Sequence, residues 1–182
     1  ADLPEAPSYF PRDAEINRSG ARELSELQPP KALTPHQVLE LRDHILLDVR
    51  SAADFGAAHV PGSMNIGLGG QFAMWAGSLI PLSASIVIIA DTNAQVDESV
   101  VRLARVGIEG VKGYLEGGVQ SWRDAGLPVD SIEQVSVSQL KEQLANSDLQ
   151  VVDVRRPGEY VNGHVPRALN APLASLDKSL GP

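Results

Sequence analysis

The chain has 182 residues, of which 43% are hydrophobic, so it can bury the core of one ordinary domain and carry further sequence. Its net charge of −8 comes without a Lys/Arg cluster, which argues against nucleic acid and anionic membranes as partners, because both require a localised basic patch. Cysteine is absent, which excludes disulfides, thiolate metal sites and thiol catalysis by these residues.

Residues 1–32 are rich in proline and show no sustained helical or strand period, which predicts an extended linker. The first residues have neither the basic region nor the apolar core of a signal peptide. The longest apolar run, residues 86–90, is too short to span a bilayer and is typical of a buried strand. The default expectation is therefore a cytoplasmic globular protein.

Short apolar strands and helices alternate after the linker. Thr34 and Pro35 are typical of a helix start, because a hydroxyl can cap the first turn and proline is tolerated there. Strands are expected at residues 45–49, 64–66, 86–90 and 111–115, and further helices at 52–57, 71–79, 97–106 and 119–125. This alternation predicts an α/β fold with a mostly parallel sheet covered on both faces.

The chain contains an internal repeat. Residues 47–50, 54–55, 59–61 and 65 recur at 152–155, 159–160, 164–166 and 170, with a constant offset of 105. The second copy is expected to have a helix capped by Ser136, a strand at 150–154, a short helix at 157–161 and a strand position at Leu169. We therefore expect a linker (1–32), a complete domain (33–130) and the front part of a second copy (131–182).

Four ordered motifs resemble the rhodanese family of sulfurtransferases: residues 47–50, 59–65, 117–122 and 125–129. The resemblance implies a rhodanese-like three-layer fold with a central parallel sheet flanked by helices, followed by an incomplete second copy. In that family the catalytic loop Cys-x-x-Gly-x-Arg follows the central strand, and its thiolate carries a persulfide. The resemblance places this loop at Asp91, Thr92, Asn93, Ala94, Gln95 and Val96.

Asp91 stands where the family has its cysteine, Ala94 where it has glycine and Val96 where it has arginine. A carboxylate cannot carry a persulfide, and next to further acidic residues it would repel an anionic sulfur donor. We expect no catalytic residue here and no sulfurtransferase activity of this domain. Asp91 as a nucleophile toward phosphate is a second interpretation, and capping of the following helix by Asp91 or Asn93 is a third.

The remaining polar motif residues are interpreted as structural. His59 and His164 occupy matching turn positions, as duplication requires. Arg50 with Asp54, and Arg155 with Glu159, are four residues apart and are expected to form ion pairs. The same motif contains Asp48 and Asp153. No metal site or cofactor is expected, because His36 and His44 have no ligand partners at metal spacing.

The aromatic helix at 71–79 presents Phe72, Met74 and Trp75, either as core or as a partner surface. Residues 9–20 and 69–77 resemble the region that follows the hydrolase domain in metallo-β-lactamase-fold proteins fused to rhodanese repeats, a group that includes persulfide dioxygenases. That resemblance implies a metallo-β-lactamase-fold domain or another sulfur-metabolism protein as a partner. The incomplete second copy could also self-associate by exchange.

Two classes of function remain open. The first is a non-catalytic module that scaffolds or binds a partner within a larger sulfur- or persulfide-metabolising protein. The second is a fragment of an active tandem sulfurtransferase, or of a persulfide dioxygenase fusion, whose catalytic residues lie outside this chain. A weaker third alternative is a regulatory site for a small anion at the loop after Asp91.

Overall fold

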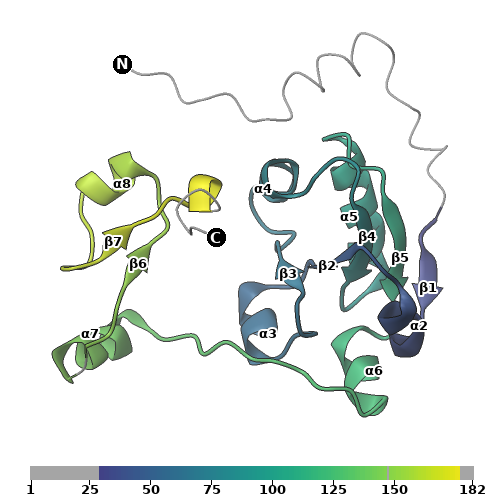
Figure 1. Cartoon of the computed structure of the whole chain (residues 1–182), viewed down its shortest axis with the longest axis horizontal. Helices are drawn as coiled ribbons and strands as arrows, with labels where there is room; N and C mark the ends of the chain where they lie inside the picture. The colour runs from purple at the N-terminus through teal and green to yellow at the C-terminus, as the bar shows by residue number, and fades with distance from the viewer. Residues whose placement is uncertain (1–28, 147, 177–182) are drawn as a thin grey trace, which may run out of the picture. The chain divides into compact units, whose positions relative to one another are not determined.

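The computed structural model of the chain describes residues 29–146 and 148–176 (Figure 1). The chain divides into two compact units, of which the first ends at Gln134 and the second begins at Val135. Most of the predicted linker, including the motif at 9–20, lies outside the described residues. Within the described ranges, no helix has the length and apolar character needed to cross a membrane.

The first unit contains a five-stranded sheet in which every pair is parallel, in the order β1-β5-β4-β2-β3. Its strands are β1 (Lys31–Leu33), β2 (His44–Asp48), β3 (Met64–Asn65), β4 (Ser85–Ile89) and β5 (Val111–Leu115). The predicted α/β fold with a parallel sheet is confirmed. Strand β1 was not predicted, and it takes Lys31 and Ala32 out of the expected linker. It forms because Lys31–Leu33 pairs with Gly113–Leu115 of β5, a contact distant in sequence.

Four helices connect these strands, namely α2 (Pro35–Glu40), α3 (Ala52–Ala57), α4 (Phe72–Leu79) and α5 (Asn93–Ala104), and α6 (Gly118–Asp124) follows β5. Thr34 caps α2 as predicted, with Gln37 completing a capping box. Helix α5 begins four residues earlier than predicted. Its capping residue is Thr92, whose side chain accepts a hydrogen bond from the Gln95 N–H.

The core lies on both faces of the sheet (Figure 1). One face packs Ile86 and Ile88 of β4 against α4 and α5, and the other packs Val87 and Ile89 against α2 and α6. Burial on both sides explains why β4 is a continuous apolar run rather than an alternating one. Phe72 is fully buried, so the aromatic helix contributes core.

The segment after α6 packs along α3. His59 and Asp130 exchange two backbone hydrogen bonds of 2.9 Å, and the Ile132 N–H donates to the Gly56 carbonyl at 2.9 Å. The Gln134 side chain donates to the Ala52 carbonyl. Two carbonyls of α3 therefore accept hydrogen bonds from donors outside the helix. The same contacts keep residues 130–134 packed with the first unit.

The second unit repeats the beginning of the first. It contains α7 (Val137–Asn146), β6 (Val152–Asp153), α8 (Pro157–Val161), β7 (Leu169–Asn170) and a 3-10 helix (Leu173–Ser175), and its two strands pair in parallel. Ser136 caps α7 as predicted, by accepting from the Gln139 N–H at 3.3 Å. At the turn where Gly62 has φ +76°, the equivalent Arg167 has φ +69°, a conformation that costs a non-glycine residue about 1 kcal/mol.

We predict that Gly118→Ala destabilises the first unit more than Gly126→Ala does. Both glycines have positive φ, +59° and +72°, but only at Gly118 would an added Cβ meet backbone, 2.7 Å from the Ala90 carbonyl oxygen. Gly126→Ala should cost about 1 kcal/mol from conformation alone. Gly118→Ala should add about 1–3 kcal/mol of steric strain. Urea unfolding followed by tryptophan fluorescence measures this, since Trp75 and Trp122 both lie in the first unit. Equal destabilisation would contradict the close-approach argument.

Candidate functional site

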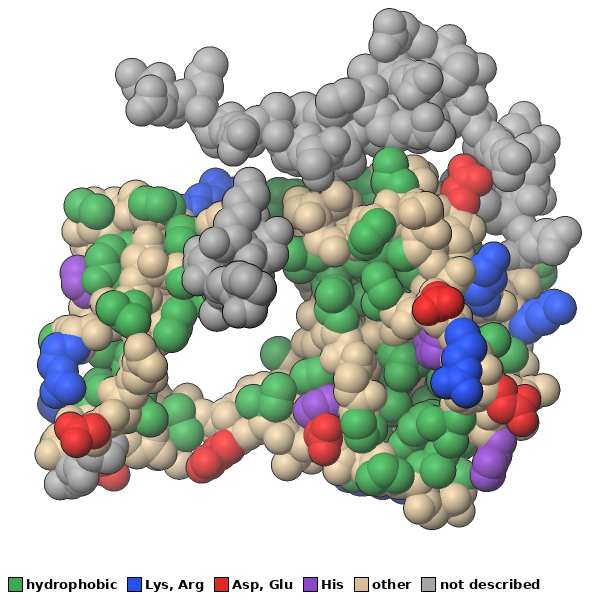
Figure 2. Space-filling view, in the orientation of Figure 1, with side chains coloured by type: hydrophobic (Ala, Val, Ile, Leu, Met, Phe, Trp, Pro, Cys, Tyr) green, Lys and Arg blue, Asp and Glu red, His purple; other side chains and the backbone are tan. Residues whose placement is uncertain are grey.

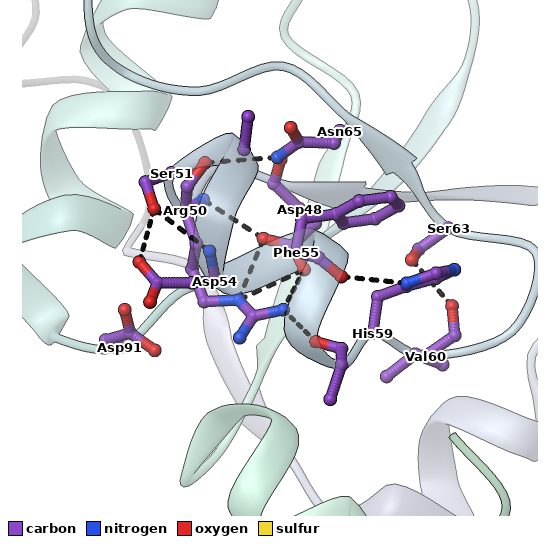
Figure 3. Close-up of polar contacts among 12 residues, drawn as sticks. Asp48, Arg50, Ser51, Asp54, Phe55, His59, Val60, Ser63, Asn65 and Asp91 are labelled. Carbon is purple, nitrogen blue, oxygen red and sulfur yellow. Dashed lines mark hydrogen bonds and ion pairs between the residues drawn. The ribbon is translucent and has the colours of Figure 1, made fainter. Parts of the chain in front are cut away.

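The candidate site lies at the carboxyl edge of the sheet, between the neighbouring strands β2 and β4. The chain leaves β2 toward β3 on one side and leaves β4 toward β5 on the other, so this edge is the topological switch point of the sheet. Ligand sites of open parallel α/β sheets form at such points. Figure 3 shows the groups that meet here: Asp48 and Arg50 after β2, Asp54 in α3 and Asp91 after β4.

A buried ion pair forms the base of this site. The Arg50 Nη2 atom donates to Asp48 Oδ2 at 2.6 Å, and Arg50 Nε donates to Asp48 Oδ1 at 3.0 Å. The Arg50 backbone N–H also donates to Asp48 Oδ1 at 3.0 Å, and Nη2 reaches the Ala58 carbonyl at 2.8 Å. The exposed fractions of the two side chains are 7% for Arg50 and 0% for Asp48.

The predicted ion pair between Arg50 and Asp54 is wrong, because the guanidinium pairs with Asp48 instead. Asp54 accepts from the Ser51 hydroxyl, while the Ser51 oxygen accepts from the Asp54 N–H at 3.1 Å and caps α3. Arg50 precedes this cap and lies outside the helix, so Arg50 and Asp54 do not share a helical face. Burial acts to lower the pKa of Arg50, but the hydrogen bond and charge of Asp48 outweigh it and raise the pKa overall.

Two further side chains hold the turn that follows β2. Asn65 donates from Nδ2 to the Asp48 carbonyl at 2.9 Å and to the Arg50 carbonyl at 3.1 Å, which joins β3 to the turn. His59 has its Nδ1 atom 2.9 Å from the Phe55 carbonyl, and its ring stacks on Phe55 with centroids 3.9 Å apart. These contacts lie within the fold and leave His59 buried.

The second unit contains the same hydrogen bonds. Arg155 Nη2 donates to Asp153 Oδ2 at 2.6 Å and to the Gly163 carbonyl at 2.9 Å. Asn170 and the stacked pair Tyr160 and His164 repeat the contacts of Asn65, Phe55 and His59. The predicted pairing of Arg155 with Glu159 is also wrong, since a Glu159 oxygen accepts from the Arg156 N–H at 3.2 Å. The hydrogen bond from Arg155 lowers the pKa of Asp153.

The stretch from Asp91 to Val96 does not form an open loop. Asn93, Ala94, Gln95 and Val96 are the first turn of α5. The Gln95 Oε1 atom accepts from the backbone N–H of Asp91 at 2.9 Å and of Thr92 at 3.1 Å, and Thr92 Oγ1 accepts from Gln95 N at 3.3 Å. Thr92 therefore caps this helix, and neither Asp91 nor Asn93 does. The amides of Asp91, Thr92 and Gln95 are therefore bonded to the chain's own side chains and are not available to an anion.

The remaining positions of this stretch carry no cationic group. Val96, at the position of the family's arginine, is buried in the core with Ile88 and Leu103. Ala94 is exposed and is part of the helix. In the described part of the chain, no group of three or more His, Asp or Glu side chains could hold a metal ion. The stretch thus contains neither a thiol nor a positively charged side chain.

Asp91 is exposed at the end of β4 and belongs to an electrostatic cluster around Arg50. Partial desolvation raises the pKa of Asp91, the positive charge of Arg50 opposes this, and the negative charges of Asp54 and Asp48 reinforce it. Three carboxylates thus lie near one guanidinium that is already paired. An added anion would be repelled here, which disfavours the small-anion alternative.

Sequence reasoning placed Gln95 in the degenerate loop but did not predict its role as a capping residue. Gln95 decides whether the amides after β4 face outward as free donors or are bonded internally. A signal was present, because Thr92 followed three residues later by Gln95 is a capping-box pattern.

The fold and this edge define a parallel α/β domain with two strand-to-helix turns side by side at the switch point of its sheet. A family model described as the rhodanese-like domain matches residues 34–125 and again residues 136–182. The chain therefore belongs to the rhodanese-like domain family, and the predicted resemblance is confirmed. The second match supports the internal repeat.

Several known proteins are similar to this chain. The HTH-type transcriptional regulator Rv0324 of Mycobacterium tuberculosis is 34% identical over 108 residues, which cover 56% of this chain and 46% of the regulator. The chain thus spans less than half the length of that relative. The Alr3790 protein from Anabaena sp. is 26% identical with a TM-score of 0.50, covering 63% of this chain and 92% of that one. A metallo-beta-lactamase from Staphylococcus aureus shares the fold, with 21% identity, a TM-score of 0.52, and coverage of 63% and 30%.

We predict that Asp48→Ala destabilises the first unit by about 3–5 kcal/mol, because it leaves the Arg50 guanidinium buried without its partner. The matched control is Asp153→Ala, whose arginine partner is 47% exposed and solvated. The control should leave the tryptophan-monitored urea midpoint of the first unit unchanged. A midpoint that does not move in Asp48→Ala would contradict the dependence of the unit on this pair.

We also predict a pH-dependent effect of Asp91→Asn. Because the pKa of Asp91 is raised in the folded state, ionising it costs stability, and this cost is present at neutral pH and disappears below the unfolded value of about 3.9. The variant should be more stable than the parent at pH 7, by at most about 0.5 kcal/mol because the group is solvated. At pH 3 the two should be equal. Urea midpoints at both pH values test this, with Asp97→Asn as the charge-matched control, and a gain that persists at pH 3 would contradict it.

Proposed function

We propose that this chain is a non-catalytic rhodanese-homology module that serves as a scaffolding or partner-binding part of a larger sulfur- or persulfide-metabolising protein. The observation that carries the proposal is the closed start of α5, where Gln95 occupies the amides of Asp91 and Thr92. Sulfur transfer requires a thiolate to accept the sulfur and donors to hold the anionic persulfide and its donor. Asp91 supplies a carboxylate instead, and Val96 supplies no charge.

In this proposal, the residues that hold the turn after β2 keep their structural role, and the turn serves binding instead of catalysis. The Asp48 and Arg50 pair, Asn65 and His59 hold the turn through hydrogen bonds within the chain. A rigid turn of this kind is suited to positioning neighbouring segments. The sequence similarity to metallo-β-lactamase-fold fusions at residues 69–77, together with the shared fold of the Staphylococcus aureus protein, supports a parent protein that joins such a hydrolase to rhodanese repeats.

The alternative is that catalysis belongs to residues outside this chain, either in an active tandem repeat or in a metallo-β-lactamase-fold persulfide dioxygenase. The gene sequence that follows Pro182 distinguishes the two. A Cys-x-x-Gly-x-Arg stretch about 105 residues after Asp91 would favour the alternative, since 105 is the offset of the repeat.

We predict that the purified chain shows no cyanide-dependent consumption of thiosulfate above buffer. Asp91→Cys should also show no consumption, for two reasons. The amide of residue 91 would still be bonded to Gln95, and the first turn of α5 carries no arginine that could hold an anionic donor. A catalytically competent rhodanese at equal concentration is the positive control. Turnover by the parent chain that survives repeated purification and falls in Asp91→Asn would overturn the proposal.

A further inference from the structure

We propose that residues 130–134 form a releasable strap that restrains the Arg50 guanidinium, and that detachment of this strap from α3 makes the buried pair of Arg50 and Asp48 open more often. The strap is the last part of the first unit, and the second unit begins directly after it at Val135. The candidate site would therefore respond to a displacement of the junction between the two repeats. This inference goes beyond the proposed function, because it does not depend on whether the domain is catalytic.

The strap is attached along α3 at every second residue. Its three attachment residues each bond to that helix or to the turn that follows it: Asp130 to His59, Ile132 to Gly56 and Gln134 to Ala52. Alternate residues that bond to one side are typical of an extended segment. In Figure 1 this segment runs beside α3 on its way from α6 to α7.

A single peptide group joins the strap to the Arg50 guanidinium. Its carbonyl, from Ala58, accepts from Arg50 Nη2 at 2.8 Å, and its N–H, from His59, donates to the Asp130 carbonyl at 2.9 Å (Figure 3). A trans peptide is planar, so its C=O and N–H point in opposite directions and turn together. Hydrogen bonds on the two sides of a peptide also polarise one another. Loss of the bond to Asp130 therefore frees the group that Arg50 uses as an acceptor.

The close approach of the strap requires a residue without a side chain at position 56. A Cβ on Gly56 would lie 2.7 Å from the Gln134 Nε2 atom and 2.9 Å from the Ile132 carbonyl oxygen. The equivalent residue of the second unit is Val161, whose side chain would prevent a segment from packing on α8 in the same way. The strap is therefore a feature of the first repeat rather than a general part of the repeated fold.

The strap can detach without opening the core. Residues 131–134 are exposed, and Figure 2 shows this segment at the surface. Hydrogen bonds rather than buried apolar surface thus hold it on α3, and segments of this kind open at a lower free energy than the core. The chain before it stays anchored, because the Trp122 Nε1–H donates to the Pro128 carbonyl at 2.8 Å and Val129 packs against the core.

The second unit shows what the strap does not do. Arg155 donates to the Gly163 carbonyl at 2.9 Å, as Arg50 does to Ala58, although no described residue takes the place of Asp130 there. The hydrogen bonds of the turn therefore form without a strap. What the strap adds is restraint on how often they break, and Arg155 is an internal reference for an arginine that lacks this restraint.

The first test measures hydrogen exchange in the full chain by NMR after Gln134→Ala, which removes one attachment outside the candidate site. The Ile132 amide and the Arg50 Nε–H should each exchange about threefold faster or more, while the Arg155 Nε–H is unchanged. Glu133→Ala is the matched control, because Glu133 lies between two attachment residues and makes none of these bonds. Faster exchange of the Ile132 amide alone, or no change in either group, would overturn the proposal.

A second variant displaces the whole strap. Gly56→Val introduces the residue found at this position in the second repeat, and it should accelerate exchange of the Arg50 Nε–H more than Gln134→Ala does. The amide of Ile88, a fully buried residue of β4, reports opening of the core in the same spectra and should not change. If Ile88 and Arg50 accelerate equally, the strap is part of the cooperative core and is not a releasable device.

The coupling must also work in the opposite direction, since coupling between two sites is reciprocal. Arg50→Lys keeps a positive charge beside Asp48 but replaces the planar fork with one ammonium, which cannot hold Asp48 and the Ala58 carbonyl in the same geometry. The Ile132 amide should then exchange about threefold faster or more. Arg155→Lys makes the same change in the second unit and should leave Ile132 unchanged. Equal effects of the two variants, or none, would overturn the coupling.

The thiosulfate assay is independent of these measurements. Turnover would refute the proposed function without affecting the exchange rates, and absence of coupling would refute the role of the strap without restoring catalysis.

Discussion

The buried pair of Asp48 and Arg50 is the interaction on which the candidate site depends. Asp48 has no solvent contact and Arg50 almost none, so each charge is compensated by the other and by backbone groups. Separating such charges leaves one of them buried and unpaired, which costs several kcal/mol. The pair therefore fixes the path from β2 into α3, and through Asn65 it also sets where β3 lies. Asp91 then faces a guanidinium whose charge is already compensated.

At the start of α5, a helix cap and an anion would compete for the same backbone donors. The amides that precede a helix can donate either to a bound anion or to a capping side chain, but the same donor does not serve both fully. Here Thr92 and Gln95 form the cap, and Val96 uses the next position to fill the core. The cap that stabilises the helix start therefore also engages the amides of Asp91 and Thr92, which could otherwise donate to an anion. An aspartate at position 91 is compatible with this arrangement because it projects into solvent at the end of β4.

Local signals predicted much of the fold. The helices at 52–57 and 157–161 and the strand at 111–115 were predicted at their observed bounds, and the parallel sheet followed from their alternation. Strand β1 was missed because Lys31–Leu33 has no strand pattern of its own and is defined by pairing with β5. The predicted partner of Arg50 was wrong because helical spacing was applied to a residue that precedes the cap at Ser51. The predicted start of α5 was too late because the capping box of Thr92 and Gln95 was overlooked.

The two units separate what local sequence determines from what the rest of the sheet determines. Asp153, Arg155, His164 and Asn170 reproduce the hydrogen bonds of the first unit although the second has only β6 and β7 among its described residues. The turn is therefore self-sufficient, and burial is not required for its geometry. Burial requires β4, β5 and the helices behind them. Because an exposed version of the same turn keeps its shape, the turn's own hydrogen bonds, rather than the sheet around it, determine its geometry.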